Sequence, residues 1–219
     1  MFYNYYDSLS GVPFYGINNA SSYIRLLHAS PGAPAVDVYA NDMLIAQNLA
    51  YRGFTPYLKV DPGEYRVAVY PTGTKTNAVI DTKLSIPPYT IYTVAAIGQL
   101  PNLSLLPVLD PRITIPPGMV MVRFVHLSPD APAVDITTGD GTPLFTNVSY
   151  KHISNYIPVP PGTYTLQARI TGTDDFVLHV PNVTLQPNRF YSVYAIGLAA
   201  DEPTLQVLIP LDGNSYLTF

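Results

Sequence analysis

The chain has 219 residues, with 11 Lys and Arg against 15 Asp and Glu and a formal net charge of −4. Only 12% of the residues are charged while 47% are hydrophobic, which excludes intrinsic disorder, and the absence of a basic run argues against a nucleic-acid partner. Because 23 prolines interrupt almost every window that could hold a helix, and Tyr, Val, Ile and Thr are enriched instead, the composition predicts an all-β fold.

Residues 1–21 form an aromatic N-terminal arm that belongs to neither of the repeats described below. A solvated tail has no physical reason to carry so many large apolar side chains. The arm has no Lys or Arg before Arg25 and no unbroken apolar core, so it does not match a standard secretion signal, and the export route is not indicated. We expect the arm to dock on protein through its aromatic residues, which are Phe2, Tyr3, Tyr5, Tyr6, Phe14 and Tyr15.

Residues 22–110 contain short strand-like runs separated by turn signals, the pattern of an antiparallel β-sandwich. The turn Asp61-Pro62-Gly63 is typical of type II, and the segment after it alternates apolar with polar residues, so one face is buried and one is wet. We expect strands at 23–28, 35–40, 43–48, 56–60, 64–70, 78–86, 89–97 and 103–109.

The second half of the chain repeats the first. Residues 25–37 recur as 123–135 with nine of thirteen positions identical, and the correspondence continues at an offset of 99 after one inserted residue. A Pro-rich linker, 111–118, precedes the second copy at 119–212, and a tail, 213–219, follows it. The sequence therefore predicts two tandem antiparallel immunoglobulin-like β-sandwich domains in a restricted relative orientation. The longest uncharged stretch, 84–109, is interrupted by prolines and indicates strands, not a membrane span.

Candidate chemistry is confined to one motif in each copy: Arg25, His28, Ser30 and Asp37, mirrored by Arg123, His126, Ser128 and Asp135. A catalytic triad needs a base within hydrogen-bond reach of an activated hydroxyl and an oxyanion hole. Both serines directly precede prolines, and neither has a glycine-rich elbow beside it. We expect a structural role instead, in which His and Ser fix the loop backbone and Arg pairs with Asp across neighbouring strands.

The sequence contains few residues that could bind a metal or a cofactor. The chain has no cysteine, which excludes disulfides, thiolate metal sites and cysteine nucleophiles. His28 with Asp37 gives two ligands per copy, fewer than the usual three or four. We therefore predict no cofactor, no metal and no catalytic residues. A clustered pocket that holds His28 or His126 with a strongly shifted pKa would favour an enzyme.

The motif H-x-S-P-x-A-P-x-V-D, at 28–37 and again at 126–135, resembles the bacterial domain-of-unknown-function family 4397. With the PG-x-Y strand that follows in each copy, the resemblance covers about 22–110 and 119–212. It implies a β-sandwich module found in tandem in secreted, cell-wall or spore-associated proteins of Gram-positive bacteria. It implies no enzymatic activity and supplies no functional residues.

Two functions remain open on these observations. The leading hypothesis is a non-catalytic structural protein of a cell or spore surface, with itself as partner, that assembles into a filament or coat layer when the arm adds to an exposed strand edge of a neighbour. The alternative is a surface module that binds cell-wall carbohydrate or a protein partner.

Overall fold

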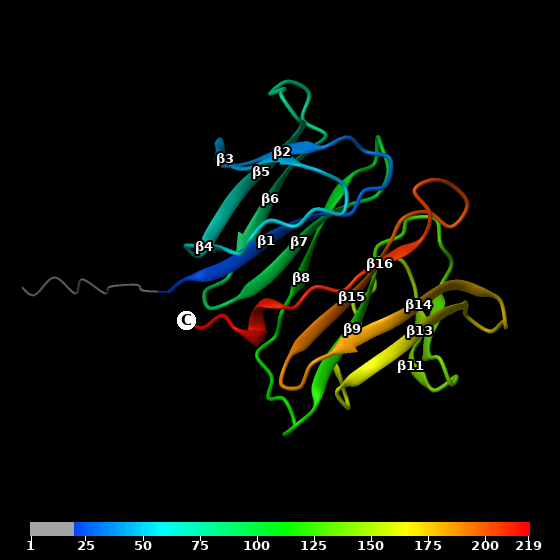
Figure 1. Cartoon of the computed structure of the whole chain (residues 1–219). Helices are drawn as coiled ribbons and strands as arrows, with labels where there is room; N and C mark the ends of the chain where they lie inside the picture. The colour runs from blue at the N-terminus through cyan, green and yellow to red at the C-terminus, as the bar shows by residue number, and fades with distance from the viewer. Residues whose placement is uncertain (1–19) are drawn as a thin grey trace, which may run out of the picture.

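The computed structural model describes residues 20–219, and in it the chain forms two β-sandwiches side by side (Figure 1). The all-β prediction is confirmed. All eight strands expected in the first copy are present, with bounds shifted by two residues or fewer. They are β1 (Ser22–His28), β2 (Val36–Ala40), β3 (Met43–Leu49), β4 (Leu58–Val60), β5 (Gly63–Pro71), β6 (Ile80–Ile86), β7 (Ile91–Ile97) and β8 (Ser104–Leu109).

The second sandwich repeats this order and ends in one turn of 3₁₀ helix, η1 (Gly213–Ser215). Within residues 20–219 no helix has the length and apolarity needed to cross a lipid bilayer. The strands of the second sandwich are β9 (Val120–His126), β10 (Val134–Thr138), β11 (Pro143–Val148), β12 (Ile157–Val159), β13 (Gly162–Ile170), β14 (Phe176–Leu185), β15 (Phe190–Ile196) and β16 (Gln206–Leu208).

Each sandwich consists of two four-stranded sheets. The first has the strand orders β4-β1-β7-β8 and β3-β2-β5-β6, and the second has β12-β9-β15-β16 and β11-β10-β13-β14. The strand pairs are antiparallel except β1 with β7 and β9 with β15, which are parallel. Five strands separate β1 from β7 along the chain, so no hairpin imposes an antiparallel direction on that pair.

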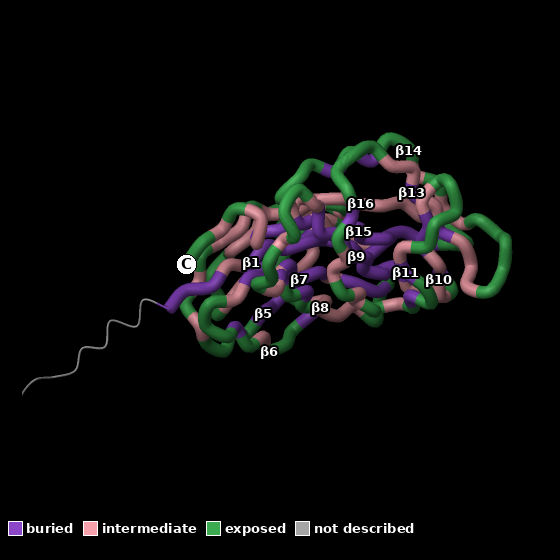
Figure 2. The backbone as a smooth tube through the Cα atoms, turned by 90° about the horizontal axis from the view of Figure 1, so that it is seen from below, coloured by how far each residue is buried: buried purple, intermediate pink, exposed green. Residues whose placement is uncertain are grey.

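The two sandwiches share a third hydrophobic core between them. In β1, Leu26 points into its own sandwich, whereas Leu27 on the opposite face joins a cluster with Val125, Tyr194 and Ile196 of the second sandwich. The central strands β1, β7, β9 and β15 are therefore covered on both faces, and Figure 2 shows them buried along most of their length. This explains why these strands carry apolar residues on both faces instead of alternating apolar with polar residues. The shared core fixes the relative orientation of the two domains.

A glycine after β7 and another after β15 are required by the same local geometry. Gly98 and Gly197 have φ of +91° and +93°, values that L side chains rarely adopt. A Cβ would also collide with a backbone carbonyl oxygen, that of Asn102 in one copy and of Thr204 in the other. The repeated Ile-Gly pair is thus a requirement of the turn that leads into β8 and β16.

The C-terminal tail crosses back to the first domain. Gly213 N donates to Asp110 Oδ2 at 3.0 Å, and Asn214 Nδ2 donates to the carbonyl of Pro111 at 3.0 Å. At the end of the chain the ring of Phe219 lies 5.5 Å from that of Tyr23. Residues 213–219 therefore add contacts between the two domains.

Candidate functional site

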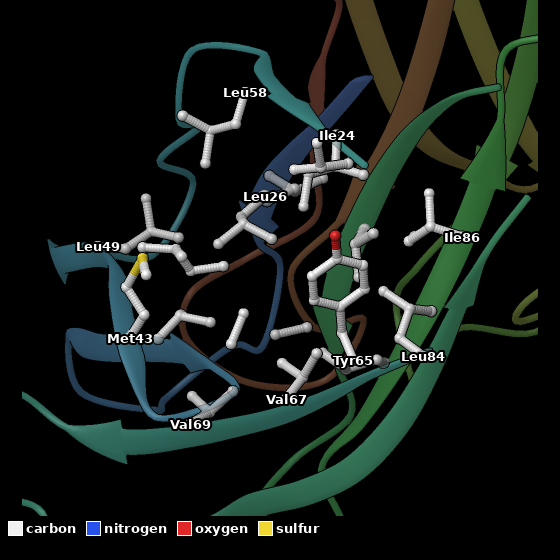
Figure 3. Close-up of a pocket in the computed structure, with 18 of the residues that line it drawn as sticks. Ile24, Leu26, Met43, Leu49, Leu58, Tyr65, Val67, Val69, Leu84 and Ile86 are labelled. Carbon is white, nitrogen blue, oxygen red and sulfur yellow. The ribbon is translucent and has the colours of Figure 1, made fainter. Parts of the chain in front are cut away.

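The first sandwich contains an apolar cavity of about 350 Å³ between its two sheets. This volume lies within the range of small-ligand pockets, about 300–1,000 Å³. Side chains from all eight strands of the domain line it, and Figure 3 shows them arranged around an open centre. The second sandwich has no comparable space within its described residues, where the corresponding voids are about 10 Å³ each.

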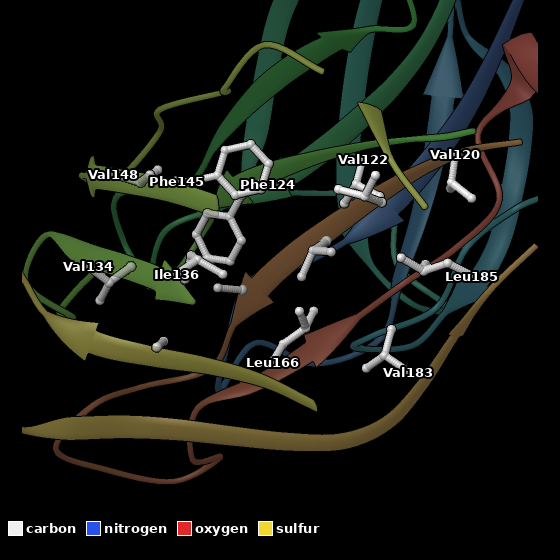
Figure 4. Packing of buried hydrophobic residues seen from close by; sticks show 14 residues of the cluster. Val120, Val122, Phe124, Val134, Ile136, Phe145, Val148, Leu166, Val183 and Leu185 are labelled. Carbon is white, nitrogen blue, oxygen red and sulfur yellow. The ribbon is translucent and has the colours of Figure 1, made fainter. Parts of the chain in front are cut away.

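At two matched positions the first core has smaller side chains than the second. Phe124 and Phe145 fill the core of the second sandwich, with their rings stacked and their centroids 6.3 Å apart (Figure 4). The corresponding residues of the first sandwich are Leu26 and Ala46. The strand register supports this correspondence, because Ala46 lies opposite Val38 as Phe145 lies opposite Ile136. The first domain thus lacks two aromatic rings at a place where its fold has room for them.

The mouth of the cavity lies between β3 and β4, two strands at sheet edges. Met43 of β3 lines the cavity while 70% of it is exposed, and Asn41 and Lys59 are exposed lining residues as well. In Figure 3, Met43 and Leu49 of β3 lie on the same side of the cavity as Leu58 of β4. The cavity is therefore open to solvent along an edge of the sandwich.

The lining offers apolar contact and very little chemistry. The Tyr65 hydroxyl already donates to the carbonyl of Asp61 at 2.7 Å. His28 lines the cavity and burial lowers its pKa, but its Nε2 donates to the carbonyl of Pro34 at 3.0 Å and its Nδ1 accepts from Ser30 N at 3.4 Å. Both ring nitrogens are thus engaged by backbone groups. The arrangement suits binding of an apolar group, not acid–base catalysis.

The repeated His and Ser do not form a catalytic pair. Ser30 Oγ is buried without a hydrogen-bond partner, and Ser128 Oγ donates to Asp130 Oδ1 at 3.2 Å. His126 repeats the contact of His28, with Nε2 3.2 Å from the carbonyl of Pro132, and burial lowers its pKa too. Each histidine fixes the loop that follows its strand. Residues 20–219 hold no group of three His, Asp or Glu placed to bind a metal ion.

The repeated Asp fixes a different loop junction. Asp37 accepts hydrogen bonds from Asn48 N at 2.8 Å and Gly73 N at 3.0 Å, and these bonds to the charged form lower its pKa. In the second copy Asp135 Oδ1 accepts from Asn147 N at 2.7 Å and from Thr171 Oγ1 at 3.0 Å. The matched Asn and Thr-Gly positions of the two repeats therefore serve as partners of this carboxylate.

The expected pairing of Arg with Asp inside each motif is wrong. Arg25 lies on β1 and Asp37 on β2, which belong to different sheets, and Arg25 shares the outward face of β1 with Leu27. Its Nη2 donates to Asp212 Oδ1 of the other domain at 3.0 Å. Arg123 Nη2 reciprocally donates to Asp110 Oδ1 of the first domain at 2.5 Å. Each arginine therefore pairs with the aspartate at the end of the other repeat.

These four residues, with Tyr57 and Tyr156, form what we call the interdomain clasp. The tyrosine hydroxyls donate to Asp110 Oδ2 at 2.8 Å and Asp212 Oδ2 at 2.6 Å, respectively. Burial raises the pKa of both tyrosines well above its ordinary value, which keeps the hydroxyls protonated as donors. Burial, together with the nearby charge of Asp110, raises the pKa of Asp212 to about 6. The charged groups are almost fully buried, so the clasp joins the domains without contact with solvent.

The family model described as a domain of unknown function, DUF4397, matches residues 22–137 and 138–215. The chain belongs to the DUF4397 family. The two matched segments meet within β10, inside the second sandwich, so their shared boundary does not follow the sheets. The resemblance noted in the sequence is confirmed.

Solved structures offer only distant likenesses to this DUF4397 protein. The Bacillus anthracis TIE protein is 12% identical with a TM-score of 0.27, over 80% of this chain and 33% of that one. A family 26 carbohydrate-binding module from Eubacterium rectale, solved with maltoheptaose, is 10% identical with a TM-score of 0.28, over 89% and 99%. A search of curated proteins finds no match. Likenesses this weak identify no function.

Sequence reasoning missed two features of the DUF4397 chain: the clasp and the cavity. The repeated Leu-Asp at 109–110 and 211–212 was a visible signal for the clasp, but nothing in the sequence paired it with the arginine of the other copy. For the cavity the signal was the change of Phe124 and Phe145 to Leu and Ala at matched positions. The assembly-arm residues Phe2, Tyr3, Tyr5, Tyr6, Phe14 and Tyr15 lie outside the described residues.

Proposed function

We propose that this protein is a non-catalytic structural component of a bacterial cell or spore surface. In this proposal it self-associates into a filament or coat layer, and the N-terminal arm of one copy adds as a strand to the first domain of the next. The observation that carries the proposal is the character of β3. This strand is a sheet edge, and its sequence MLIAQNL holds no charged residue and no proline.

Exposed strand edges template association unless charge, proline or short length protects them. Every other edge strand between residues 20 and 219 carries such protection. In the first domain β6 has Asp81 and Lys83, β8 has Pro107, and β4 is three residues long. In the second domain β11, β12 and β14 contain proline and β16 has three residues.

The contrast between β3 and its counterpart β11 is the sharpest. β3 begins with Met43 and Leu44, which are 70% and 43% exposed. The corresponding residues of the second domain are Thr142 and Pro143. Both strands share the same bulged register with their partner, so the bulge does not distinguish them. One copy thus keeps an apolar edge that the other copy has lost.

The rigid coupling of the two domains suits a structural unit. The clasp and the shared core hold the sandwiches in one orientation, so a contact made at β3 would set the position of the whole molecule. The family resemblance supports a surface location, because it implies secreted, cell-wall or spore-associated modules. None of the described residues forms a catalytic constellation that would favour an enzyme.

The proposal is tested by comparing the intact protein with a variant that lacks residues 1–19. We expect the intact protein to form filaments or sheets in negative-stain microscopy and large species in sedimentation velocity, and the truncated protein to remain monomeric. Equal assembly of the two proteins would contradict the role of the arm. A monomeric intact protein would contradict self-association itself.

A matched pair of edge variants sharpens this test. Leu44→Lys places a charge on β3 and should abolish assembly, because a charged side chain on an edge strand opposes strand addition. Pro143→Lys makes the equivalent change on β11, an edge already blocked by proline, and should leave assembly intact. Equal effects of the two substitutions would show that β3 is not the acceptor.

A second candidate function, binding of cell-wall carbohydrate, is favoured by one exposed aromatic group. Tyr89 is 52% exposed and Phe219 is 38% exposed, and their rings lie 5.8 Å apart beside Arg112. Exposed rings of this kind suit stacking against sugar faces. Binding of the intact protein to purified cell wall, lost in Tyr89→Ala and kept in Leu44→Lys, would favour this function over self-association.

A further inference from the structure

We infer that the cavity of the first sandwich is an acceptor for aromatic side chains, and that the N-terminal arm of a second copy supplies them. This inference rests on the proposed self-association and names the site at which it occurs. The cavity, the unprotected edge of β3 and the arm then belong to one joint between neighbouring molecules.

The position of the mouth connects strand addition with the cavity. A strand added beside β3 would continue the sheet β3-β2-β5-β6, and its alternate side chains would point into the interior of the sandwich. The cavity opens between β3 and β4, next to that added strand. An arm bound along β3 would therefore cover the mouth with its backbone and insert every second side chain.

The second domain indicates which side chains fit. In it the equivalent space is filled by the two stacked rings of Phe124 and Phe145, which are 1% and 8% exposed. The first domain has the same strands around this space but lacks both rings. An occupant that supplies two aromatic groups would restore the packing that the second domain achieves within its own chain.

The arm carries such groups at strand spacing. In an extended segment Tyr3 and Tyr5 fall on one face, while Phe2 and Tyr6 fall on the other. Asn41 and Lys59 at the mouth give a tyrosine hydroxyl polar partners, which a buried hydroxyl needs. The lining holds no acidic side chain that would favour a cationic ligand.

The length of the arm permits the contact. Nineteen residues precede the described structure, and an extended chain of that length spans up to about 60 Å. Ser22, where β1 begins, is paired with Val60, which lines the cavity. Strand β1 therefore begins close to the acceptor site of its own domain, and an extended segment of nineteen residues is long enough to reach a neighbouring copy.

Because the chain has no cysteine, single introduced thiols report this contact cleanly. We would mix full-length Tyr5→Cys protein with full-length Met43→Cys protein, oxidise the mixture, and detect disulfide-linked heterodimers by non-reducing gel and mass spectrometry. We expect efficient cross-linking between the two variants. Its absence, with Tyr3→Cys and Phe2→Cys tested in the same way, would overturn the inference.

Filling the cavity provides the decisive variant. Ala46→Phe, added to the Met43→Cys acceptor, copies the residue that the second domain has at this position and should lower the cross-linking yield by at least about tenfold. Leu26→Phe is a second variant of the same design in case the first fails to fold. Gln47→Phe adds the same ring at an exposed position of β3 and should leave the yield unchanged. Equal yields from Ala46→Phe and Gln47→Phe would overturn insertion into the cavity.

Two aromatic-pair variants test the alternation. Tyr3→Ser with Tyr5→Ser, and Phe2→Ser with Tyr6→Ser, each remove two rings from one face of the arm. We expect only one pair to reduce assembly strongly, measured by sedimentation velocity. Equal losses, or no loss from either pair, would overturn insertion by an alternating strand.

The outcomes separate this inference from the proposed function. If Ala46→Phe protein kept the cross-link and still assembled through its arm, the cavity inference would fail and self-association would stand. If a Tyr5→Cys and Met43→Cys double variant cross-linked only within single chains, the arm would occupy its own cavity, which would overturn assembly by exchange between copies.

Discussion

The two sandwiches have the same strand order, the same parallel pair and the same repeated motif, yet their cores differ. The second core is closed by Phe124 and Phe145, and the first, with Leu26 and Ala46, keeps a cavity of about 350 Å³. The difference shows that the sheet framework does not depend on those two rings. The loop contacts of His and Asp, and the clasp, hold the framework in both domains, which leaves the first core free to serve another purpose.

The largest effect is expected from making the second core resemble the first. Phe145→Ala should lower the free energy of unfolding by about 3–5 kcal/mol, because it removes a buried ring and leaves a cavity that the surrounding sheets fill only partly. Urea denaturation measures the change. A loss below about 1 kcal/mol would mean that the second sandwich collapses around the missing ring and that the two cores are interchangeable.

The next effect concerns the clasp, to which each domain contributes one arginine and one aspartate. Arg123→Ala should lower stability by about 3 kcal/mol, because it leaves the carboxylate of Asp110 buried without its partner. Arg25→Ala should cost somewhat less, since Arg123 also lies 4.0 Å from Asp212 and retains part of the compensation. Denaturation of the two variants checks this order.

The control for the clasp is an exposed ion pair. Arg66 pairs with Asp81 on the surface of the first domain, and Arg66→Ala should lower stability far less than Arg123→Ala, because water screens the exposed pair. If Arg66→Ala and Arg123→Ala had similar effects, burial of the clasp would not be the source of its contribution.

A smaller effect of opposite sign is expected from making the first core resemble the second. Ala46→Phe should raise the free energy of unfolding by about 1 kcal/mol, because it fills apolar space that is already formed. The melting temperature should rise in a protein lacking residues 1–19, where no arm competes for the space. A destabilisation would mean that the first sandwich cannot accept a ring where the second one does.

The last effect is a pH dependence that originates in the clasp. The pKa of Asp212 is raised to about 6 from an ordinary value of 3.8, so the folded chain binds more protons than the unfolded chain between these values. The stability that this group contributes is fully present below about pH 4 and is lost as the pH rises through about 6, which for a shift from 3.8 to about 6 amounts to about 3 kcal/mol. Asp37, whose pKa is lowered, acts in the opposite direction and loses its contribution as the pH falls.

Carbon-detected NMR of the Asp212 carboxyl group measures this directly. Titration near pH 6 is expected, and titration near pH 4 would show that the arginines outweigh burial. From pH 4 to pH 7 we expect the free energy of unfolding of the intact protein to fall relative to that of Asp212→Asn, which lacks the titrating carboxyl group.

Much of the fold was predictable from local pattern. Strand alternation, the turn at Asp61-Pro62-Gly63 and the repeat itself placed all eight strands of the first copy, because these signals depend on neighbouring residues only. The structural contacts of His28 with the following loop also follow from local geometry. The predicted partner of Arg25 was wrong because the residue lies on the outward face of β1. Nothing in the local sequence indicates that this face packs against the other domain.

By itself, the sequence determined the all-β class, the duplication and the strand positions, since periodicity and turn chemistry act over a few residues. Only the tertiary structure decided that Arg25 pairs with Asp212 and Arg123 with Asp110, because these partners are brought together by packing one domain on the other. The cavity is likewise a property of the folded structure. Leu26, which lines the cavity, and Ala46, which packs against the same core, are ordinary apolar residues in the chain, and a cavity exists only where two sheets, held at a fixed distance by other contacts, enclose the space between them.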